Sequence, residues 1–152
     1  MTLMPVEKFE KNPAVVGDGA RVEIRSQSDL APARELGRTL AVHLGFPSCD
    51  LPVIAAVISE LARNILDYAK HGEIIVMSAG NNGTRGIRIV AHDEGPGIPD
   101  VAQALRLGYS TSGGLGLGLP GVRQVTDDFA ITSAPGRGTT VSVMKWKRRV
   151  TH

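Results

Sequence analysis

The stretch Glu60-Leu-Ala-Arg-Asn64-Ile-Leu-Asp67 decides how the rest of the chain is interpreted. Spacings of four and three residues place Glu60, Asn64 and Asp67 above one another on a single face of a helix. Another face of the same helix is apolar and consists of Ile54, Ile58, Leu61, Ile65 and Ala69. A carboxylate beside an amide oxygen can accept a proton or help to hold a magnesium ion. The stretch therefore predicts an apolar helix that carries a stripe of chemically useful groups.

Two glycine-rich segments further along the chain have the chemistry of nucleotide binding. Asp93-Glu-Gly95-Pro-Gly97 is typical of a turn that exposes one carboxylate. Ser112-Gly-Gly114-Leu-Gly116-Leu-Gly118 has few side chains, so its backbone N–H groups can contact phosphate oxygens. Each segment alone has a simpler interpretation, because a polar helical stripe is usually solvated and Asp-x-Gly-x-Gly is often a plain turn. Together with the helix, they indicate an ATP site.

A nicotinamide cofactor is the alternative that the glycines also suggest. Gly116-Leu-Gly118-Leu-Pro-Gly121 matches the dinucleotide fingerprint, which requires a β-strand immediately before it. Residues 107–114 are polar and glycine-rich instead. The fingerprint also requires an acidic residue about twenty positions later to bind a ribose, and no Asp or Glu follows Asp128. These two departures argue against a nicotinamide site.

The order and spacing of these segments resemble the GHKL ATPase/kinase superfamily over roughly residues 20 to 147. The N box of that family is matched by Glu60 and Asn64, whereas Asp67 is matched in only some of its branches. The G1 and G2 boxes are matched by Asp93, Gly95, Gly97, Gly114, Gly116 and Gly118. Thr139, in Gly136-Arg-Gly138-Thr139, matches a late threonine near the adenine. Four motifs in order are far more specific than any one of them.

The resemblance implies ATP and Mg²⁺ as ligands and assigns a role to each group of residues. It implies that Asp93 accepts a hydrogen bond from the adenine 6-amino group, that Gly97 lets the backbone approach the purine, and that Thr139 binds the same edge. Asn64 would offer an oxygen to magnesium, and Glu60 would accept the proton of a substrate serine or threonine hydroxyl or, in an ATPase, orient a water molecule. The glycines of the G2 box would bind phosphates through their N–H groups, and Ser110 and Thr111 would contact the γ-phosphate.

Within the superfamily, four stretches look like the RsbT family of stressosome serine/threonine kinases. They span residues 34–38, 58–65, 93–100 and 108–116. This resemblance implies a kinase that phosphorylates STAS-domain scaffold proteins (RsbS/RsbR-like) and then activates a downstream signalling protein. Two alternatives stay open: an anti-sigma-factor kinase that phosphorylates an anti-sigma-factor antagonist, and a nucleotide-gated interaction module with little turnover.

Composition and charge argue against several other classes of protein. The formal net charge of +2 is too small to indicate a nucleic-acid partner. Cys49 is the single cysteine, so no disulfide forms within the chain and a reducing compartment fits best. The first residues lack the pattern of a signal peptide, and no apolar run approaches the length of a membrane span. We therefore expect a cytoplasmic protein without a membrane partner.

The pattern along the chain predicts one domain at residues 20–152 after a flexible extension at 1–19, and the resemblance implies that this is a GHKL ATP-binding kinase domain. Expected strands are 21–25, 73–79, 86–91, 130–133 and 140–145, and an Asn-Asn-Gly turn at 81–83 joins the second and third of them. Expected helices run from 28 or 29 to 44, from about 50 through Asp67, and from 119 to 128, with one or two helical turns at 100–107 and a flexible lid at 108–118. This predicts an α+β protein, a two-layer α/β sandwich with helices on one face of a mixed, mostly antiparallel sheet. The GHKL (Bergerat) ATP-binding fold, which the resemblance implies, has this architecture.

Overall fold

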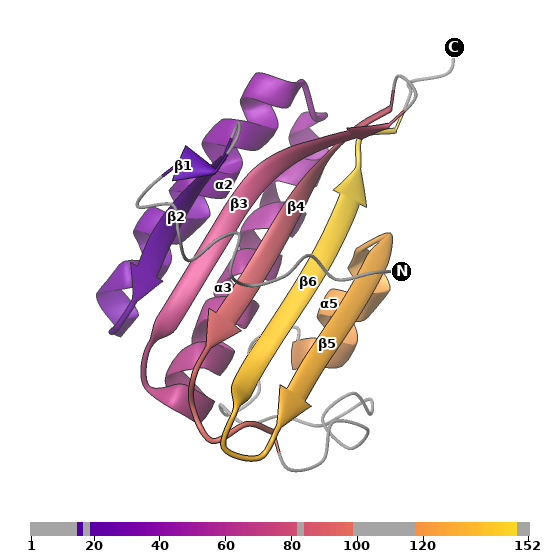
Figure 1. The fold of residues 1–152 in the computed structure, drawn as a ribbon. Coiled ribbons are helices and arrows are strands. Elements are labelled where there is room, and N and C mark those ends of the chain that lie inside the picture. The colour runs from indigo at the N-terminus through magenta and orange to yellow at the C-terminus, as the bar shows by residue number, and fades with distance from the viewer. Residues whose placement is uncertain (1–14, 17–18, 82–83, 99–117, 149–152) are drawn as a thin grey trace.

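A computed structural model of the chain describes residues 15–16, 19–81, 84–98 and 118–148. In these residues the fold is a two-layer sandwich, with helices packed on one face of a sheet (Figure 1). The helices are α2 (Leu30–Leu44), α3 (Leu51–Ala69) and α5 (Gly118–Val125), and short 3-10 turns, η1 (Gln27–Asp29) and η2 (Ser48–Asp50), lead into the first two. The strands are β1 (Val15–Val16), β2 (Gly19–Ile24), β3 (Gly72–Asn81), β4 (Thr84–Asp93), β5 (Asp128–Ala134) and β6 (Gly138–Trp146).

The sheet has the strand order β1-β2-β3-β4-β6-β5. The predicted α+β sandwich is therefore confirmed. We expected a mixed sheet, but every pair of strands that the structure describes is antiparallel. The expected hairpin joins β3 to β4, and its pairing continues as far as Asn81 and Thr84, so both strands are longer than predicted.

The third helix ends earlier than the sequence suggests. We expected it to reach Asp128, but α5 ends at Val125 and Asp128 begins β5. The backbone N–H of Asp127 already donates to the Met144 carbonyl at 2.8 Å, so the chain joins the sheet there. Asp127 and Asp128 therefore join the sheet, although their local sequence is compatible with a helix.

The core forms where α3 packs on the sheet. Its apolar face was predicted correctly, since Ile54, Ile58, Leu61 and Ile65 are buried in one cluster with β3 and β4 side chains. Helix α2 packs closely on α3 at Gly37, where an added Cβ would meet the Ile58 side chain. The polar face of α3 is thereby fixed in direction, toward the end of the sheet where β4 and β6 carry Asp93 and Thr139.

Several expectations fall outside the described residues. They include residues 1–14 and 17–18 of the extension, the helical turns at 100–107, and the lid at 108–117. Within the extension the structure describes β1, where Val15 pairs with Ala20 and Val16 with Gly19. Among the described residues, no helix is long and apolar enough to cross a membrane.

Candidate functional site

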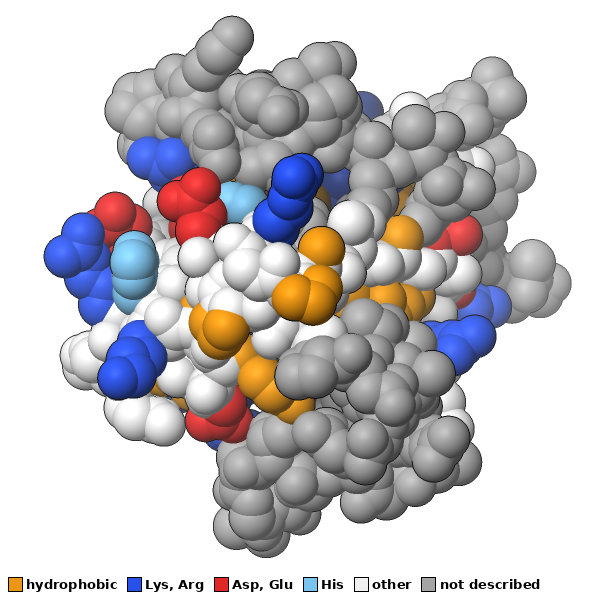
Figure 2. Space-filling view, turned by 60° about the horizontal axis from the view of Figure 1, so that its bottom comes forward, with side chains coloured by type: hydrophobic (Ala, Val, Ile, Leu, Met, Phe, Trp, Pro, Cys, Tyr) orange, Lys and Arg blue, Asp and Glu red, His pale blue; other side chains and the backbone are white. Residues whose placement is uncertain are grey.

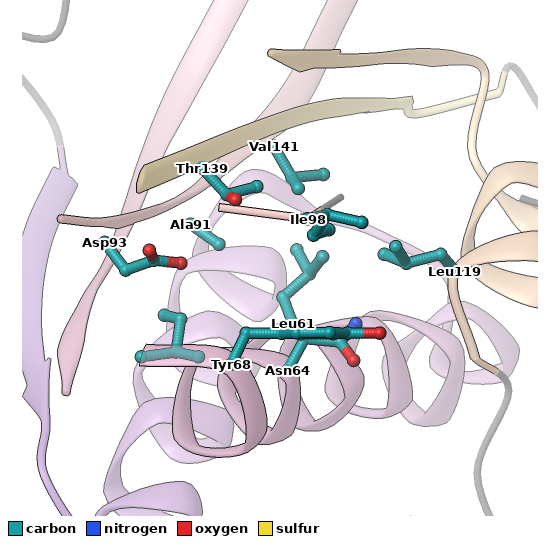
Figure 3. Close-up of a pocket in the computed structure, with 10 residues that line it drawn as sticks. Leu61, Asn64, Tyr68, Ala91, Asp93, Ile98, Leu119, Thr139 and Val141 are labelled. Atoms are coloured by element: carbon teal, nitrogen blue, oxygen red, sulfur yellow. The ribbon is translucent and has the colours of Figure 1, made fainter. Parts of the chain in front are cut away.

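A pocket lies where the polar face of α3 meets the ends of β4 and β6 (Figure 3). Its polar groups come from three of the predicted residues, Asn64, Asp93 and Thr139. The remaining walls are mainly hydrophobic and are formed by Leu61, Ile65, Tyr68, Ala91, Ile98, Leu119 and Val141. Such a lining, apolar with a few convergent polar groups, is typical of small-molecule sites. The structure thus brings the N box, the G1 box and the late threonine together.

The pocket is narrow. It encloses about 20 Å³, enough for a water molecule by volume, whereas ligand sites usually enclose roughly 300–1,000 Å³. A purine would need more space than these lining residues enclose. Figure 2 looks onto this end of the molecule, where hydrophobic side chains reach the surface at the centre and charged side chains lie around them, most of them on the left.

Asp93 stands at the end of β4 with only 5% of its surface exposed. Its Oδ1 accepts the N–H of Gly95 at 2.9 Å, which closes the turn that follows the strand. Burial raises the pKa of the Asp93 carboxyl above its ordinary value, and the Gly95 N–H partly opposes this by stabilising the charge. In its ionised form, Asp93 is a hydrogen-bond acceptor in a largely apolar pocket.

The side-chain amide of Asn64 has a nitrogen that donates no hydrogen bond to another described residue. Its Nδ2 is buried and has no hydrogen-bond partner among the described residues. A buried donor without a partner is costly, so such an atom indicates a place for a ligand. Because an amide offers a donor on one side and an oxygen on the other, turning it about its axis presents the oxygen at the same place.

The oxygen of Asn64 is a possible ligand for a magnesium ion that a nucleotide carries. Among the described residues, no group of three or more His, Cys, Asp or Glu side chains could hold a metal ion. Mg²⁺ commonly takes one or two protein oxygens, keeps several waters and binds substrate phosphates. The single oxygen of Asn64 suits a metal that arrives with a nucleotide.

Glu60 is buried one turn before Asn64, and both of its carboxylate oxygens are engaged. Oε1 lies 2.6 Å from Nη1 of Arg63, and Oε2 accepts the N–H of Gly118 at 3.1 Å. The structure thus places Glu60 beside the last glycine of the predicted G2 box, at the start of α5. Sequence reasoning missed Arg63, although its i,i+3 spacing from Glu60 signals a pair on one helix face. Asp67 is exposed on the outside of α3.

Close packing within the protein itself requires glycine at two positions at this end of the sheet. Gly97 has φ of +85°, and an added Cβ would overlap the Ala134 carbonyl oxygen. A Cβ on Gly95 would overlap Ala69 at the end of α3. We expected Gly97 to let the backbone approach a purine, and the structure shows a close approach to a protein carbonyl there. Of the other predicted residues, Ser110, Thr111, Gly114 and Gly116 lie outside the described residues.

Ser133 is a second residue that sequence reasoning missed. It lies on β5, and its Oγ is 2.8 Å from Oγ1 of Thr139. The same oxygen accepts the N–H of Ile98 at 2.7 Å, so Ser133 ties the segment after Gly97 to β6. Nothing in its local sequence distinguishes Ser133 from other strand serines, because its partners are distant or lie across a turn.

One protein family and several known proteins are similar to this chain. The model of the family described as "Histidine kinase-, DNA gyrase B-, and HSP90-like ATPase" matches residues 49–149. The chain is similar to the serine/threonine-protein kinase RsbT of Bacillus subtilis (strain 168), with 45% identity over 133 residues that cover 88% of this chain and 100% of that protein. It is also similar to the adaptive-response sensory kinase SasA of Synechococcus sp. (strain CC9311), with 28% identity over 74% of this chain and 34% of that protein. Among solved structures, the mycobacterial sensor histidine kinase MprB matches with a TM-score of 0.49 and 20% identity, over 66% of this chain and 74% of that chain.

Proposed function

The chain belongs to the histidine kinase-, DNA gyrase B- and HSP90-like ATPase family, and we infer that it is an ATP-dependent serine/threonine protein kinase. The family implies use of ATP, and RsbT, which is similar over its whole length, bears the name of a serine/threonine kinase. We further propose that the substrates are STAS-domain scaffold proteins of the RsbS/RsbR kind. After phosphorylating them in the cytoplasm, the kinase leaves the scaffold and activates a downstream signalling protein.

One observation carries the proposal: Asn64, Asp93 and Thr139, from three distant segments, converge on one pocket. In the proposed complex, Asp93 accepts a hydrogen bond from the 6-amino group of adenine. Guanine has a carbonyl at that position, so its oxygen would face the Asp93 carboxylate without a hydrogen between them. The apolar walls exclude water, which strengthens the selected hydrogen bond and increases the cost of the wrong one.

The phosphates would lie between Asn64 and the start of α5. Asn64 would give one oxygen to Mg²⁺, and the metal, when bound, neutralises phosphate charge. The N–H of Gly118 points from the N-terminal end of α5, a favourable place for an anion, and Gly114 and Gly116 would add their own N–H groups. Because Gly118 donates to Glu60, a phosphate would have to replace that hydrogen bond.

Glu60 is the general base of the proposed reaction. Its carboxylate accepts the proton of the substrate serine or threonine hydroxyl while the hydroxyl oxygen bonds to the γ-phosphorus. The bond from that phosphorus to the bridging oxygen breaks, and ADP is the leaving group. Arg63 holds one oxygen of Glu60 and so orients the other. Ser110 and Thr111 would contact the γ-phosphate in this scheme.

Phosphate transfer tests the proposal directly. The protein is incubated with ATP labelled on the γ-phosphate and, in separate reactions, with STAS-domain scaffold proteins or with an anti-sigma-factor antagonist. We expect label on a serine or threonine of the STAS protein. Label on the antagonist alone would identify an anti-sigma-factor kinase. ATP binding without transfer to either protein would identify a nucleotide-gated interaction module.

Glu60→Gln separates chemistry from binding in the same assay. The variant should bind ATP with nearly unchanged affinity and transfer phosphate about 10²–10⁴-fold more slowly, the usual contribution of a positioned base. Glu35→Gln is the matched control, because Glu35 also pairs with an arginine three residues later but lies on the surface of α2. It should behave like the wild type. Wild-type transfer by Glu60→Gln would end the general-base assignment.

A further inference from the structure

Ser133 joins three segments at the wall of the pocket. Its Oγ accepts the N–H of Ile98 at 2.7 Å, lies 2.8 Å from Oγ1 of Thr139, and lies 3.2 Å from the carbonyl oxygen of Gly138. Ser133 pairs with Thr139 across β5 and β6, and Thr139 pairs with Asp93 across β6 and β4. Three polar residues therefore form one row across neighbouring strands, with two of them lining the pocket.

Counting hydrogens gives the direction of these bonds. A hydroxyl group has one hydrogen to donate and two lone pairs that accept. The Ile98 N–H occupies one lone pair of Ser133, and the Gly138 carbonyl can only accept, so it takes the hydrogen of Ser133. The second lone pair of Ser133 then accepts the hydrogen of Thr139. Only this arrangement satisfies all three contacts.

In this arrangement the hydrogen of the Thr139 hydroxyl points to Ser133, so toward the pocket this hydroxyl can only accept hydrogen bonds. Ionised Asp93, whose side chain lies on the same side of the pocket as Thr139 in Figure 3, is also an acceptor. Both groups therefore favour a ligand edge that donates hydrogen bonds. A 6-aminopurine has such an edge, because its exocyclic nitrogen carries two hydrogens. A purine without that amino group offers neither of them.

We propose that Ser133 is a positioning residue for nucleotide selection, which holds the Thr139 hydroxyl as an acceptor and so adds to the preference for a 6-aminopurine. The inference rests on the proposed function, because it takes adenine as the base in this pocket. Ser133 itself does not touch the nucleotide in this scheme. It acts through Thr139. Replacing Ser133 should therefore change the selectivity between purine bases more than the affinity for the phosphates.

The test compares the affinities of the protein for two ligands, ATP and purine riboside triphosphate. The second ligand differs from ATP by a hydrogen in place of the 6-amino group. Ser133→Ala releases the Thr139 hydroxyl, which can then turn and donate, so the affinity ratio of ATP to the analogue should fall roughly two- to tenfold, the factor that one ordinary hydrogen bond supplies. Loss of the partner of the Ile98 N–H would lower both affinities alike and leave the ratio unchanged.

Three further variants make the result decisive. Ser133→Thr keeps the hydroxyl and should restore the ratio, and Thr132→Ala, which removes a neighbouring exposed hydroxyl from β5, should not change it. In a Thr139→Val background, Ser133→Ala should have no further effect on the ratio. An unchanged ratio in Ser133→Ala, or a fall of equal size in the Thr139→Val background, would overturn the inference. If the wild type bound neither nucleotide, the proposed function itself would fail.

Discussion

At the scale of single residues, the proposed role of Asp93 in nucleotide recognition opposes the stability of the folded chain. Burial raises the pKa of its carboxyl above 3.8, so the folded chain holds a proton there more tightly than the unfolded chain. The free energy of unfolding therefore falls as pH rises from the unfolded pKa through the raised folded pKa. Ionisation of the buried Asp93 carboxyl therefore lowers the stability of the folded protein, and the proposed site needs the ionised form.

Asp93→Asn should separate the two effects. The amide keeps an oxygen that can accept the Gly95 N–H but removes the buried charge, so unfolding at neutral pH should require a higher temperature than in the wild type. The difference should shrink as pH falls, because wild-type Asp93 then becomes protonated. ATP affinity should fall by about 1.5–3 kcal/mol, the range for a hydrogen bond to a charged group. Titration calorimetry and thermal unfolding measure the two quantities, and unchanged ATP affinity would remove Asp93 from the site.

Local sequence patterns predicted some of the polar residues that line the pocket, such as Asn64 and Asp93, but did not predict a role for Ser133. Asp93 and Asn64 carry functional groups within recognisable local patterns, a strand end before glycines and a helical stripe. Ser133 acts through contacts with Ile98 and Thr139 that exist only after β5 and β6 pair and the segment after Gly97 packs on them. Such contacts between distant segments cannot be predicted from the local sequence around Ser133.

At the scale of elements, the turn after β4 and the turn between β5 and β6 hold each other through their backbones. The N–H of Gly136 donates to the Pro96 carbonyl at 2.9 Å, and Gly97 packs on the Ala134 carbonyl. Both glycines have positive φ, +76° for Gly136 and +85° for Gly97. The two positions differ in the room available for a side chain, because a Cβ on Gly136 would meet no atom within 4 Å.

This difference gives a matched pair of variants. Gly136→Ala should lower the free energy of unfolding by about 1–2 kcal/mol, the cost of a left-handed backbone for a residue with a Cβ. Gly97→Ala should lower it further, because its Cβ also displaces Ala134, and it should weaken ATP binding by moving Ile98 at the pocket wall. Denaturant unfolding of both variants measures the difference. Equal losses would show that the two turns do not pack tightly on each other.

Element types were predictable where the local pattern agreed with the final packing. The apolar period of α3 and the two β-rich runs on either side of Asn-Asn-Gly are strong local signals, and the helix and the pairing of β3 with β4 were predicted correctly. The end of α5 was not, because its position depends on the bond from the Asp127 N–H to Met144 in β6. The pairing of distant segments thus determines where α5 ends, and the local sequence predicted this end wrongly.

At the scale of the whole molecule, the pocket lies between the two layers of the sandwich. The sheet contributes Asp93 and Thr139, and the helices contribute Asn64 and Leu119. The layered fold was predictable from the order of the elements, but the width of the gap between the layers depends on side-chain packing. With about 20 Å³ enclosed, this gap would have to widen to admit the base of the proposed complex, and a conformational change of this kind usually slows association.

Leu119 is the wall residue whose truncation tests this step. It is buried on α5 and lines the pocket, whereas Val122, one turn later, is buried on the same helix without lining it. Leu119→Ala should destabilise the protein by about 2–5 kcal/mol, as leucine truncations in cores do, yet it should speed the association of a fluorescent adenine nucleotide by widening the pocket. Val122→Ala should also destabilise the protein but leave the association rate as in the wild type. Stopped-flow measurements compare the rates. If Leu119→Ala bound the nucleotide no faster than Val122→Ala, separation of α5 from the sheet would not limit entry, and the pocket would have to open at another wall.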